Sequence, residues 1–408
     1  MKKDKLLVIA TTFPRWENDK EATFVKDLCK EQSKDFEVHV LVPHYKNLKL
    51  REKVDNLYIH RFVYFFPRYQ KLAYGGILPN IKKNRLLIFQ APFLFISMLF
   101  NTMKIIKKEK IRIIHAHWFF PQGLIAAICN KYLKTKSVVT IHAGCVTGLS
   151  NILVLKRWIS DFTVKNTDVI ISVSNFGKEL LESMVSKKIK EIVKKKTKII
   201  PMGVYTKDFK IKINKNQLKK KYKIKQKTII LFLGRLAEKK GVKYLIKALP
   251  LIKNKDYILL IGGDGPLKKE LQVLIDKHKL KDKVKFLGYI TGKEKINFIL
   301  LSDILAIPSI ITKEGDTEGL PVTIMEGTAA GLPIITTNVG GIKDIIKNNQ
   351  NGILIQEKNP KQIAEKIDYL INNKKFAQKI SRNALMTSKG YDWERIGEKN
   401  IKLLKKLI

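Results

Sequence analysis

Short apolar runs recur along this chain, and stretches long enough to form a helix separate most of them. In the first half the runs cover residues 6–10, 36–43, 58–65, 111–118, 137–144 and 168–174. A second series covers residues 228–235, 257–265, 284–290, 304–309, 332–341 and 352–356. Near-continuous apolar runs are typical of strands in a parallel sheet whose two faces are covered by helices. The pattern therefore predicts an α/β fold with a doubly wound sheet in each half of the chain.

Two domains are expected from the length as well as from the two series. A chain of 408 residues is longer than a single compact core usually allows. Residues 206–227, between the series, are polar and rich in lysine. We therefore predict a first domain over 1–205, a second over 206–390, and a C-terminal helix over 391–408 that packs back on the first. Ligands of open α/β sheets bind beyond the carboxyl ends of the strands, so the two Rossmann-like domains are expected to face each other across a binding cleft.

The net charge predicts an anionic neighbour. Lys and Arg number 79 against 36 Asp and Glu, which gives a formal charge of +43. Nucleic acid and an anionic membrane surface both attract a polybasic protein, although a general lysine bias of the source proteome would explain the same count. The lysines are not interleaved with aromatic side chains in a nucleic-acid-reading motif. The sequence therefore favours a membrane surface, with no nucleic acid as partner.

The N-terminal and cysteine patterns favour the cytoplasm. Only Leu6–Ala10 is apolar before polar residues return, which is shorter than the apolar region of a signal peptide. Cys29, Cys129 and Cys145 are odd in number and form no Cys-x-x-Cys pair. This usage fits a reducing compartment.

The longest apolar stretch, Leu86–Met103, is broken by Gln90, Pro92, Ser97 and Asn101. It is of marginal length for crossing a bilayer, so we predict a helix that is buried or lies on a membrane surface. Basic residues accompany this stretch at Arg68, Lys71, Lys82, Lys83, Arg85, Lys104, Lys107 and Lys108. This combination motivates the hypothesis of a peripheral position on the inner face of the plasma membrane.

The turn after the run at 228–233 combines glycines with cations. Its sequence, GRLAEKKG, contains Gly234, Arg235, Lys240 and Gly241. Arginine grips phosphate oxygens with a planar fork and lysine adds a point charge, so a tight strand-to-helix turn that carries both suits a diphosphate. In a chain this rich in lysine, chance would place the same two cations together about as readily.

The segment EGLPVTIMEG gives a more specific signal. Proline is well tolerated near the start of a helix, so a helix is predicted to begin just after Glu318, with its first N–H groups free to hold a phosphate. Glu326 would then lie about two turns in, roughly 12 Å along the axis. That distance exceeds the spacing of a glycosidase acid and base pair and suits two ends of one extended ligand. The alternative is an ordinary pair of surface glutamates.

The ordered set of motifs resembles a known enzyme family. GRLAEKKG, GGDGPLKKEL, FLGYI, AIPS, EGLPVTIMEGTAAGLPIITTNVGG and NGILI are similar to the donor half of the family-four retaining glycosyltransferases, which have the GT-B fold. The first-half motifs FPRWENDKEATFV, HAHWFFPQGL, TIHAG and IPMGV resemble the acceptor half of the same family more loosely. The resemblance covers nearly the whole chain, and the order of the motifs is more specific than any one of them.

The resemblance implies roles for individual residues. Arg235 and Lys240 would bind the donor diphosphate, and Glu326 would hold the ribose. Glu318 would face the transferred sugar, and His142, in TIHAG, would lie near the sugar and the acceptor. The donor would also meet Gly234, Gly288, Gly319, Leu320 and Pro321.

The histidines have a plainer interpretation as well. A histidine at the end of a buried strand is often structural, which is the alternative for His142. His115 and His117 flank Ala116, so strand alternation places them on one face, for structural or acceptor-side roles.

The predicted activity is retaining transfer of a hexose-type sugar from a UDP- or GDP-sugar to an acceptor hydroxyl. A lipid-linked or glycan acceptor in cell-surface polysaccharide or glycolipid synthesis is favoured over a small soluble acceptor. No Asp-x-Asp is present, so no metal is predicted, and no cofactor is expected besides the donor. Competing hypotheses are a nucleotide-sugar epimerase, a phosphorylase, and a basic nucleic-acid-binding protein.

Overall fold

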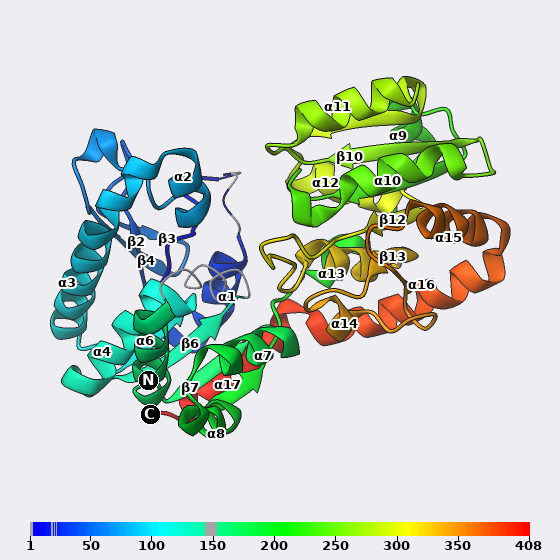
Figure 1. The fold of residues 1–408 in the computed structure, drawn as a ribbon. Helices are drawn as coiled ribbons and strands as arrows, with labels where there is room; N and C mark the ends of the chain where they lie inside the picture. The colour runs from blue at the N-terminus through cyan, green and yellow to red at the C-terminus, as the bar shows by residue number, and fades with distance from the viewer. Residues whose placement is uncertain (1–2, 18, 20, 22, 143–152) are drawn as a thin grey trace. The chain divides into compact units, whose positions relative to one another are not determined.

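The computed structural model describes residues 3–17, 19, 21, 23–142 and 153–408. Within them the chain forms two compact units (Figure 1). Unit 1 comprises Met1–Met202 together with Trp393–Ile408, and unit 2 comprises Gly203–Asp392. Cys145 and the end of the predicted run at 137–144 lie outside the described residues.

Unit 1 is built on a sheet with the strand order β3-β4-β2-β1-β5-β6-β7-β8. The central strand β1 (Asp4–Ile9) pairs in parallel with β2 on one side and with β5 on the other. The order of the strands therefore reverses at β1. The remaining strands are β2 (Phe36–Pro43), β3 (Arg51–Val54), β4 (Leu57–Phe62), β5 (Ile113–His117), β6 (Lys136–Ile141), β7 (Val169–Ser172) and β8 (Thr197–Ile199).

Two strands of unit 1 were not predicted, and both lie at an edge of the sheet. β3 pairs antiparallel with β4 and consists of the residues REKV, which alternate between exposed and half-buried. β8 has the sequence TKI and buries only Thr197. An edge strand has one free side and is often blunted with charged residues, so neither segment carries the apolar run that marks the inner strands.

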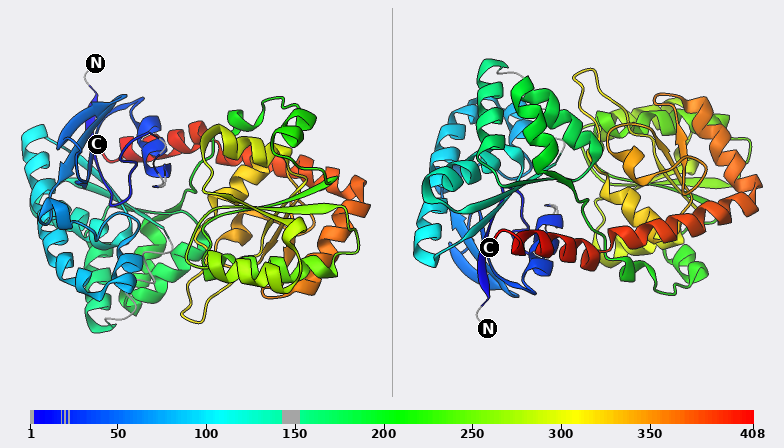
Figure 2. Two further views of the ribbon diagram at one scale, coloured as in Figure 1. Left: turned by 90° about the horizontal axis from the view of Figure 1, so that it is seen from above. Right: turned by 90° about the horizontal axis from the view of Figure 1, so that it is seen from below.

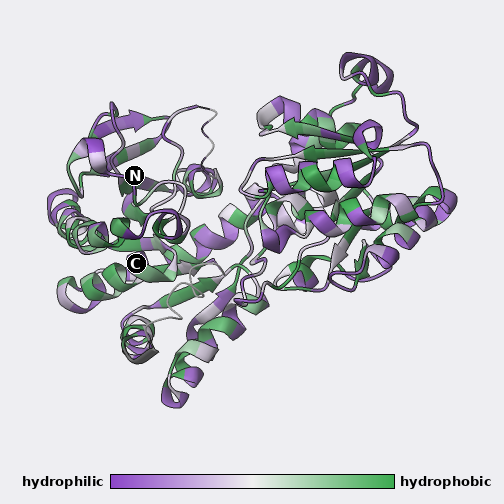
Figure 3. Ribbon diagram, turned by 45° about the horizontal axis from the view of Figure 1, so that its top comes forward, coloured by the Kyte–Doolittle hydropathy of each residue, from purple (hydrophilic) through white to green (hydrophobic). Residues whose placement is uncertain are grey.

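Helices cover both faces of this sheet. They are α1 (Phe24–Gln32), α2 (Ile77–Lys83), α3 (Ala91–Glu109), α4 (Leu124–Leu133), α6 (Leu153–Lys165), α7 (Asn175–Met184), α8 (Lys187–Lys196) and α17 (Trp393–Lys405). The core between the layers is made of side chains from alternate strand positions, among them Leu7, Ile9, Ile114, Val139 and Ile170. Figure 3 shows this apolar interior in the strands and on the inner sides of the helices.

The C-terminal helix α17 packs against α1, although the two lie at opposite ends of the sequence (Figure 2). A methyl group added to Gly397 of α17 would lie 2.5 Å from the Cβ of Glu31 in α1, so the two backbones approach closely at this point. Lys405 also forms an ion pair with Asp35, just after α1.

Unit 2 is built on an all-parallel sheet with the order β11-β10-β9-β12-β13-β14. Its strands are β9 (Thr228–Leu233), β10 (Tyr257–Gly262), β11 (Val284–Gly288), β12 (Ile304–Ile307), β13 (Ile334–Thr337) and β14 (Ile353–Ile355). Each of them lies within a predicted apolar run. β9 pairs with β10 on one side and β12 on the other, so the order reverses at β9.

The helices of unit 2 flank this sheet. They are α9 (Lys215–Lys221), α10 (Val242–Ala248), α11 (Lys268–Lys277), α12 (Gly292–Leu301), α13 (Val322–Ala329), α14 (Ile342–Ile345), α15 (Pro360–Asn372) and α16 (Lys374–Ser388). The segments that enter and leave the unit are joined. Val204 N–H donates to the carbonyl of Tyr391 at 2.8 Å, and the hydroxyl of Thr206 donates to Asp392.

Candidate active site

The loop Gly234–Gly241 leaves β9 where the strand order of unit 2 reverses, which is the usual ligand position in an open α/β sheet. Leu236 is buried and anchors the loop, and Ile310 N–H donates to the carbonyl of Lys239 at 2.8 Å. Gly241 has φ +65°, and a Cβ at this position would lie 1.8 Å from the carbonyl oxygen of Pro308. The loop after β9 is thus held against the segment that follows β12.

Two lysines of this loop pair with carboxylates from the segment before α13. Lys240 Nζ lies 3.1 Å from Glu318 Oε2, and these side chains are only 13% and 8% exposed. The stem of Lys240 passes over Gly234, with Cε 3.4 Å from where a Cβ would stand. Lys239 Nζ lies 3.1 Å from Asp316 Oδ1. The predicted cation and the predicted sugar-facing carboxylate are therefore in direct contact.

Glu318 is firmly held but has unused hydrogen-bonding capacity. Its carbonyl accepts from Gly341 N–H at 3.2 Å, and a Cβ on Gly340, which has φ +56°, would lie 1.9 Å from the same oxygen. Its second carboxylate oxygen, Oε1, is buried with no hydrogen-bond partner among the described residues, and the same holds for the hydroxyl of Ser309. Leaving a buried polar atom unpaired is unfavourable, so a hydrogen-bond donor that reaches either atom would stabilise it.

The helix after Glu318 starts later than predicted. α13 begins at Val322, and Pro321 precedes it in an extended conformation with ψ 111°. Gly319, Leu320 and Pro321 therefore connect Glu318 to the helix instead of forming its first turn. The prediction that the helix begins just after Glu318, with Glu326 about two turns in, was therefore wrong. Glu326 lies four residues, or roughly 6 Å of helix, beyond Val322.

Glu326 also has a partner, which the sequence did not reveal. Lys295 Nζ of α12 lies 2.5 Å from Glu326 Oε1. The charge of Lys295 also acts on a second carboxyl group, that of Asp208 in the turn Thr206–Phe209. Burial raises the pKa of Asp208, and the charge of Lys295 opposes that rise. No spacing singles out Lys295 in a chain so rich in lysine.

The remaining predicted donor residues lie at open positions. Arg235 is exposed, and in the described part of the chain no ion pair involves it. Gly288 ends β11 with φ +70°, and nothing lies within 4 Å of where its Cβ would be. Both leave room for a ligand to approach.

The predicted site histidine lies in unit 1. His115 and His117 of β5 do share a face, with ring centroids 4.6 Å apart, as predicted. His142 follows β6, and its Nε2 lies 3.3 Å from His117 Nδ1. Gln32 Nε2 donates to His115 Nδ1 at 2.9 Å, which leaves His115 Nε2–H to donate to the hydroxyl of Thr140 at 2.7 Å.

These rings are neutral at physiological pH. Burial lowers the pKa of His115 to about 3, and burial together with the charge of His115 lowers the pKa of His142 to about 3. A neutral imidazole can hydrogen-bond to a sugar hydroxyl, but it is a poor source of a proton at pH 7.

Acidification from pH 7 to pH 6 is expected to destabilise the chain. The folded-state pKa values of about 3 for His115 and His142 lie below the ordinary 6.5, so the unfolded chain binds protons that the folded chain does not. Above pH 6.5 the two rings are neutral in the folded and the unfolded chain, so they do not lower the free energy of unfolding. Below pH 6.5 the unfolded chain gains protons that the folded chain cannot bind, and the free energy of unfolding falls. Each ring should account for roughly 0.7 kcal/mol over this pH unit. Denaturant titrations at both pH values should show the loss, and His115→Gln should reduce it by one ring's share; an undiminished pH dependence in this variant would contradict the prediction.

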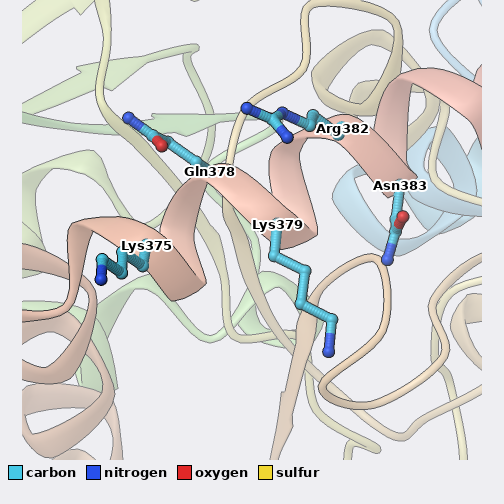
Figure 4. Close-up of a pocket in the computed structure, with 5 residues that line it drawn as sticks. All are labelled: Lys375, Gln378, Lys379, Arg382 and Asn383. Carbon is cyan, nitrogen blue, oxygen red and sulfur yellow. The ribbon is translucent and has the colours of Figure 1, made fainter.

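Unit 2 also has two surface hollows. One lies along α16 and is lined by Lys375, Gln378, Lys379, Arg382 and Asn383, as Figure 4 shows. All five side chains belong to one face of a single helix, so it is a solvated basic face. The other lies at the carboxyl ends of β13 and β14 and is lined by polar groups that include Asn338, Gln356 and Glu357.

Two family models match the chain, one in each half. A model described as Glycosyltransferase Family 4 matches residues 22–208, and a model described as Glycosyl transferases group 1 matches residues 214–386. The second match contains Arg235, Lys240, Glu318 and Glu326.

Individual relatives are also similar to the chain. An uncharacterised glycosyltransferase of Methanocaldococcus jannaschii, MJ1178, is 30% identical over 360 residues, which is 86% of this chain and 90% of that protein. The UDP-Gal:alpha-D-GlcNAc-diphosphoundecaprenol alpha-1,3-galactosyltransferase of Escherichia coli is 30% identical over 270 residues, which is 63% of this chain and 66% of that protein. Sucrose-phosphate synthase from Thermosynechococcus elongatus matches in structure with a TM-score of 0.80 and 17% identity, and 99% of each chain is covered. At this identity the likeness shows the fold alone.

Proposed function

Starting from the fact that this chain belongs to the group 1 glycosyltransferases and has their GT-B fold, we propose that it transfers a hexose-type sugar from a UDP- or GDP-sugar to an acceptor hydroxyl with retention of configuration. The observation that carries the proposal is the contact between Lys240 and Glu318 at the strand-order reversal of unit 2. In this contact the lysine that we propose as the diphosphate ligand lies beside a carboxylate whose buried Oε1 has no hydrogen-bond partner among the described residues.

In this proposal the donor binds across the carboxyl ends of the strands of unit 2. Arg235 and Lys240 hold the diphosphate, which would be helped by the first N–H groups of α13, since these lack partners within the helix. Glu326 accepts from the ribose hydroxyls and is positioned by Lys295. Glu318 Oε1 accepts from a hydroxyl of the transferred sugar. Gly234, Gly288, Gly319, Leu320 and Pro321 shape the surrounding backbone.

The proposed reaction exchanges one bond at the anomeric carbon for another on the same face of the sugar. The bond from that carbon to the phosphate oxygen breaks, and both its electrons leave with the nucleoside diphosphate. The acceptor oxygen forms the new bond, and its proton passes to a phosphate oxygen of the leaving group. Arg235 and Lys240 stabilise the negative charge that develops on the phosphate. Because these two residues supply positive charge at the leaving group, we propose that no metal is needed.

For the acceptor we propose a lipid-linked or glycan substrate of cell-surface polysaccharide or glycolipid synthesis, used at the cytoplasmic face of a membrane. The Escherichia coli relative supports this choice, because its name specifies an acceptor attached to diphosphoundecaprenol. His142 of unit 1 is proposed to contact the sugar or the acceptor as a neutral hydrogen-bonding group.

A thermal-shift panel with UDP, GDP and ADP tests the donor site. A nucleotide at one hundred times its dissociation constant should stabilise the folded state by about 2.7 kcal/mol, and we expect a selective upward shift with UDP or GDP. In Glu326→Gln and in Lys295→Met the shift at the same concentration should shrink, because the ribose contact is lost or misplaced.

Lys375→Met, on the exposed basic face of α16, is the matched control and should respond like the wild type. A chain that none of the nucleotides stabilises at millimolar concentration would contradict the proposed donor site. An equal shift in Glu326→Gln and the wild type would contradict the role of Glu326.

A further inference from the structure

Unit 1 carries a group of large apolar side chains that face solvent. Six of them form what we call the apolar face, and each is at least 54% exposed. They are Phe66, Leu86, Phe89, Phe93, Ile96 and Phe100. Single exposed apolar residues are common on soluble proteins, but a contiguous patch marks an interaction site.

The apolar face is contiguous across two segments of the chain. The Phe65 ring lies 5.4 Å from that of Phe66 and 5.6 Å from that of Phe93, so it joins the loop after β4 to α3. The hydroxyl of Ser97 donates to the carbonyl of Val63 at 2.7 Å, which holds the same loop against α3 one turn further on. Phe93, Ile96 and Phe100 follow one another at helical spacing and so form a single stripe.

The opposite side of α3 is fully used within unit 1. Leu94, Met98, Thr102, Ile105 and Ile106 are buried, and the helix packs over β1, β2 and β4. The continuous helical stretch Arg85–Glu109 is long and apolar enough to cross a bilayer by length and composition. Spanning a membrane would require this buried side to leave the core, so the packed helix can only lie along a membrane surface.

The segment of the chain that carries the apolar face holds charges of one sign. The sequence contains no Asp or Glu between Asn56 and Lys108. The eight basic residues noted beside the apolar stretch are all exposed. Two of them, Lys104 and Lys107, continue the stripe of Phe93, Ile96 and Phe100 at the same helical spacing. An apolar stripe that runs into lysines matches the layering of an anionic bilayer, where lipid phosphates lie just outside the acyl chains.

We propose that unit 1 docks on an anionic lipid bilayer through the apolar face. α3 lies along the membrane surface at a slant, with its N-terminal end deeper, so that Phe93, Ile96 and Phe100 enter the boundary between headgroups and acyl chains. Lys104 and Lys107, nearer its C-terminal end, contact lipid phosphates. The inference deepens the proposed transfer to a lipid-linked acceptor, because it specifies the surface of unit 1 that meets the membrane. Its structural basis is independent of the donor site in unit 2.

Sedimentation with two kinds of vesicle tests the proposal on the full chain. One kind contains phosphatidylcholine alone, and the other contains equal parts of phosphatidylcholine and phosphatidylglycerol. The wild type should partition onto the phosphatidylglycerol vesicles at low salt and less so as salt rises. The triple variant Phe93→Ser, Ile96→Ser, Phe100→Ser should partition roughly a hundred-fold more weakly. Lys104→Gln with Lys107→Gln should lower partitioning by roughly ten-fold or more.

Unit 2 provides matched controls. Leu251, Val273 and Met386 are similarly exposed apolar residues of unit 2, and their triple replacement by serine should leave partitioning unchanged. Lys375→Gln with Lys379→Gln, on the basic face of α16, removes the same charge elsewhere (Figure 4). If the lysine control weakened binding as much as Lys104→Gln with Lys107→Gln, attraction would be a property of the total charge. If the serine control weakened it as much as the triple variant of the apolar face, attraction would be a property of exposed apolar side chains in general. Either result would overturn the proposal.

Insertion itself can be observed directly. A polarity-sensitive fluorophore on Ile96→Cys, in a background where Cys145 is serine, should shift to the blue with phosphatidylglycerol vesicles. The same label on Val273→Cys should not shift. A wild type that stays in the supernatant with both vesicles, or a label at position 96 that senses only water, would overturn the docking surface.

The nucleotide shift of unit 2 separates this test from that of the transferase activity. If UDP and GDP fail to stabilise the chain while vesicle binding follows the expected pattern, the proposed donor chemistry is wrong and the docking surface stands. If the triple variant at Phe93, Ile96 and Phe100 keeps the wild-type nucleotide shift and loses only the vesicles, both proposals are supported.

Discussion

Replacing Lys240 with alanine is expected to lower the rate of sugar transfer by a factor of about 10²–10³. Lys240 is the largely buried cation of the proposed diphosphate site, and its charge would be most effective as negative charge builds up on the leaving phosphate. The variant should also unfold more easily. Removing the side chain of Lys240 leaves the carboxylate of Glu318, which is only 8% exposed, without its partner. Breaking a buried ion pair from one side lowers the free energy of unfolding by about 3 kcal/mol or more.

The two consequences of Lys240→Ala can be separated with a double variant. Adding Glu318→Gln removes the unpaired charge, so the stability measured by denaturant should largely return while the rate of transfer stays low. Arg235→Ala offers a second comparison, because Arg235 is exposed: its rate should fall without a change in stability. Near-normal turnover in both Lys240→Ala and Arg235→Ala would show that the diphosphate does not bind at this loop.

Replacing Gly241 with alanine is expected to reduce the free energy of unfolding by about 3 kcal/mol or more. A residue with a side chain costs about 1–2 kcal/mol in the left-handed conformation that Gly241 adopts. The added methyl group would also stand 1.8 Å from the carbonyl oxygen of Pro308, and forced overpacking costs a further 1–3 kcal/mol or so. Since backbone atoms make the contact, the loop after β9 must move, and nucleotide binding should weaken with it.

Gly292→Ala is the matched control for this prediction. Gly292 has φ +53°, but nothing lies within 4 Å of where its Cβ would be. Its replacement should therefore cost only the conformational part, about 1 kcal/mol. Equal losses in the two variants, measured by denaturant unfolding, would mean that the contact with Pro308 does not constrain the loop.

The sequence predicted the strands well wherever they are buried on both sides. Every inner strand of the two sheets overlaps a predicted apolar run, since a strand covered by helices on both faces is apolar along most of its length. β3 and β8 lack such a run because an edge strand needs neither two buried faces nor apolar residues throughout. β3, with the charged sequence REKV, gives no local signal at all. Its place depends on pairing with β4, which the sequence of β3 alone does not encode.

The proposed site residues were named from motifs, and the motifs did not predict how these residues pair. Lys240 and Glu318 are far apart in the sequence, and they meet only because β9 and β12 are neighbours in the sheet. The start of α13 was misplaced because proline is accepted both before a helix and within its first turn, so Pro321 alone does not decide between Glu318 and Val322. Lys295 could not be singled out, since its pairing with Glu326 joins α12 to α13 in the folded chain and follows from no spacing in the sequence.

The return of α17 to unit 1 has a consequence for synthesis on the ribosome. Multidomain chains generally complete their N-terminal domain first, but here the surface of α1 that α17 covers stays bare until α17, which follows unit 2 in the sequence, has been synthesised. Unit 2 is one uninterrupted segment whose ends are joined through Val204 and Tyr391. It can therefore reach its native state while unit 1 still lacks α17. Unit 2, which carries the proposed donor site, is expected to mature first although it is encoded second.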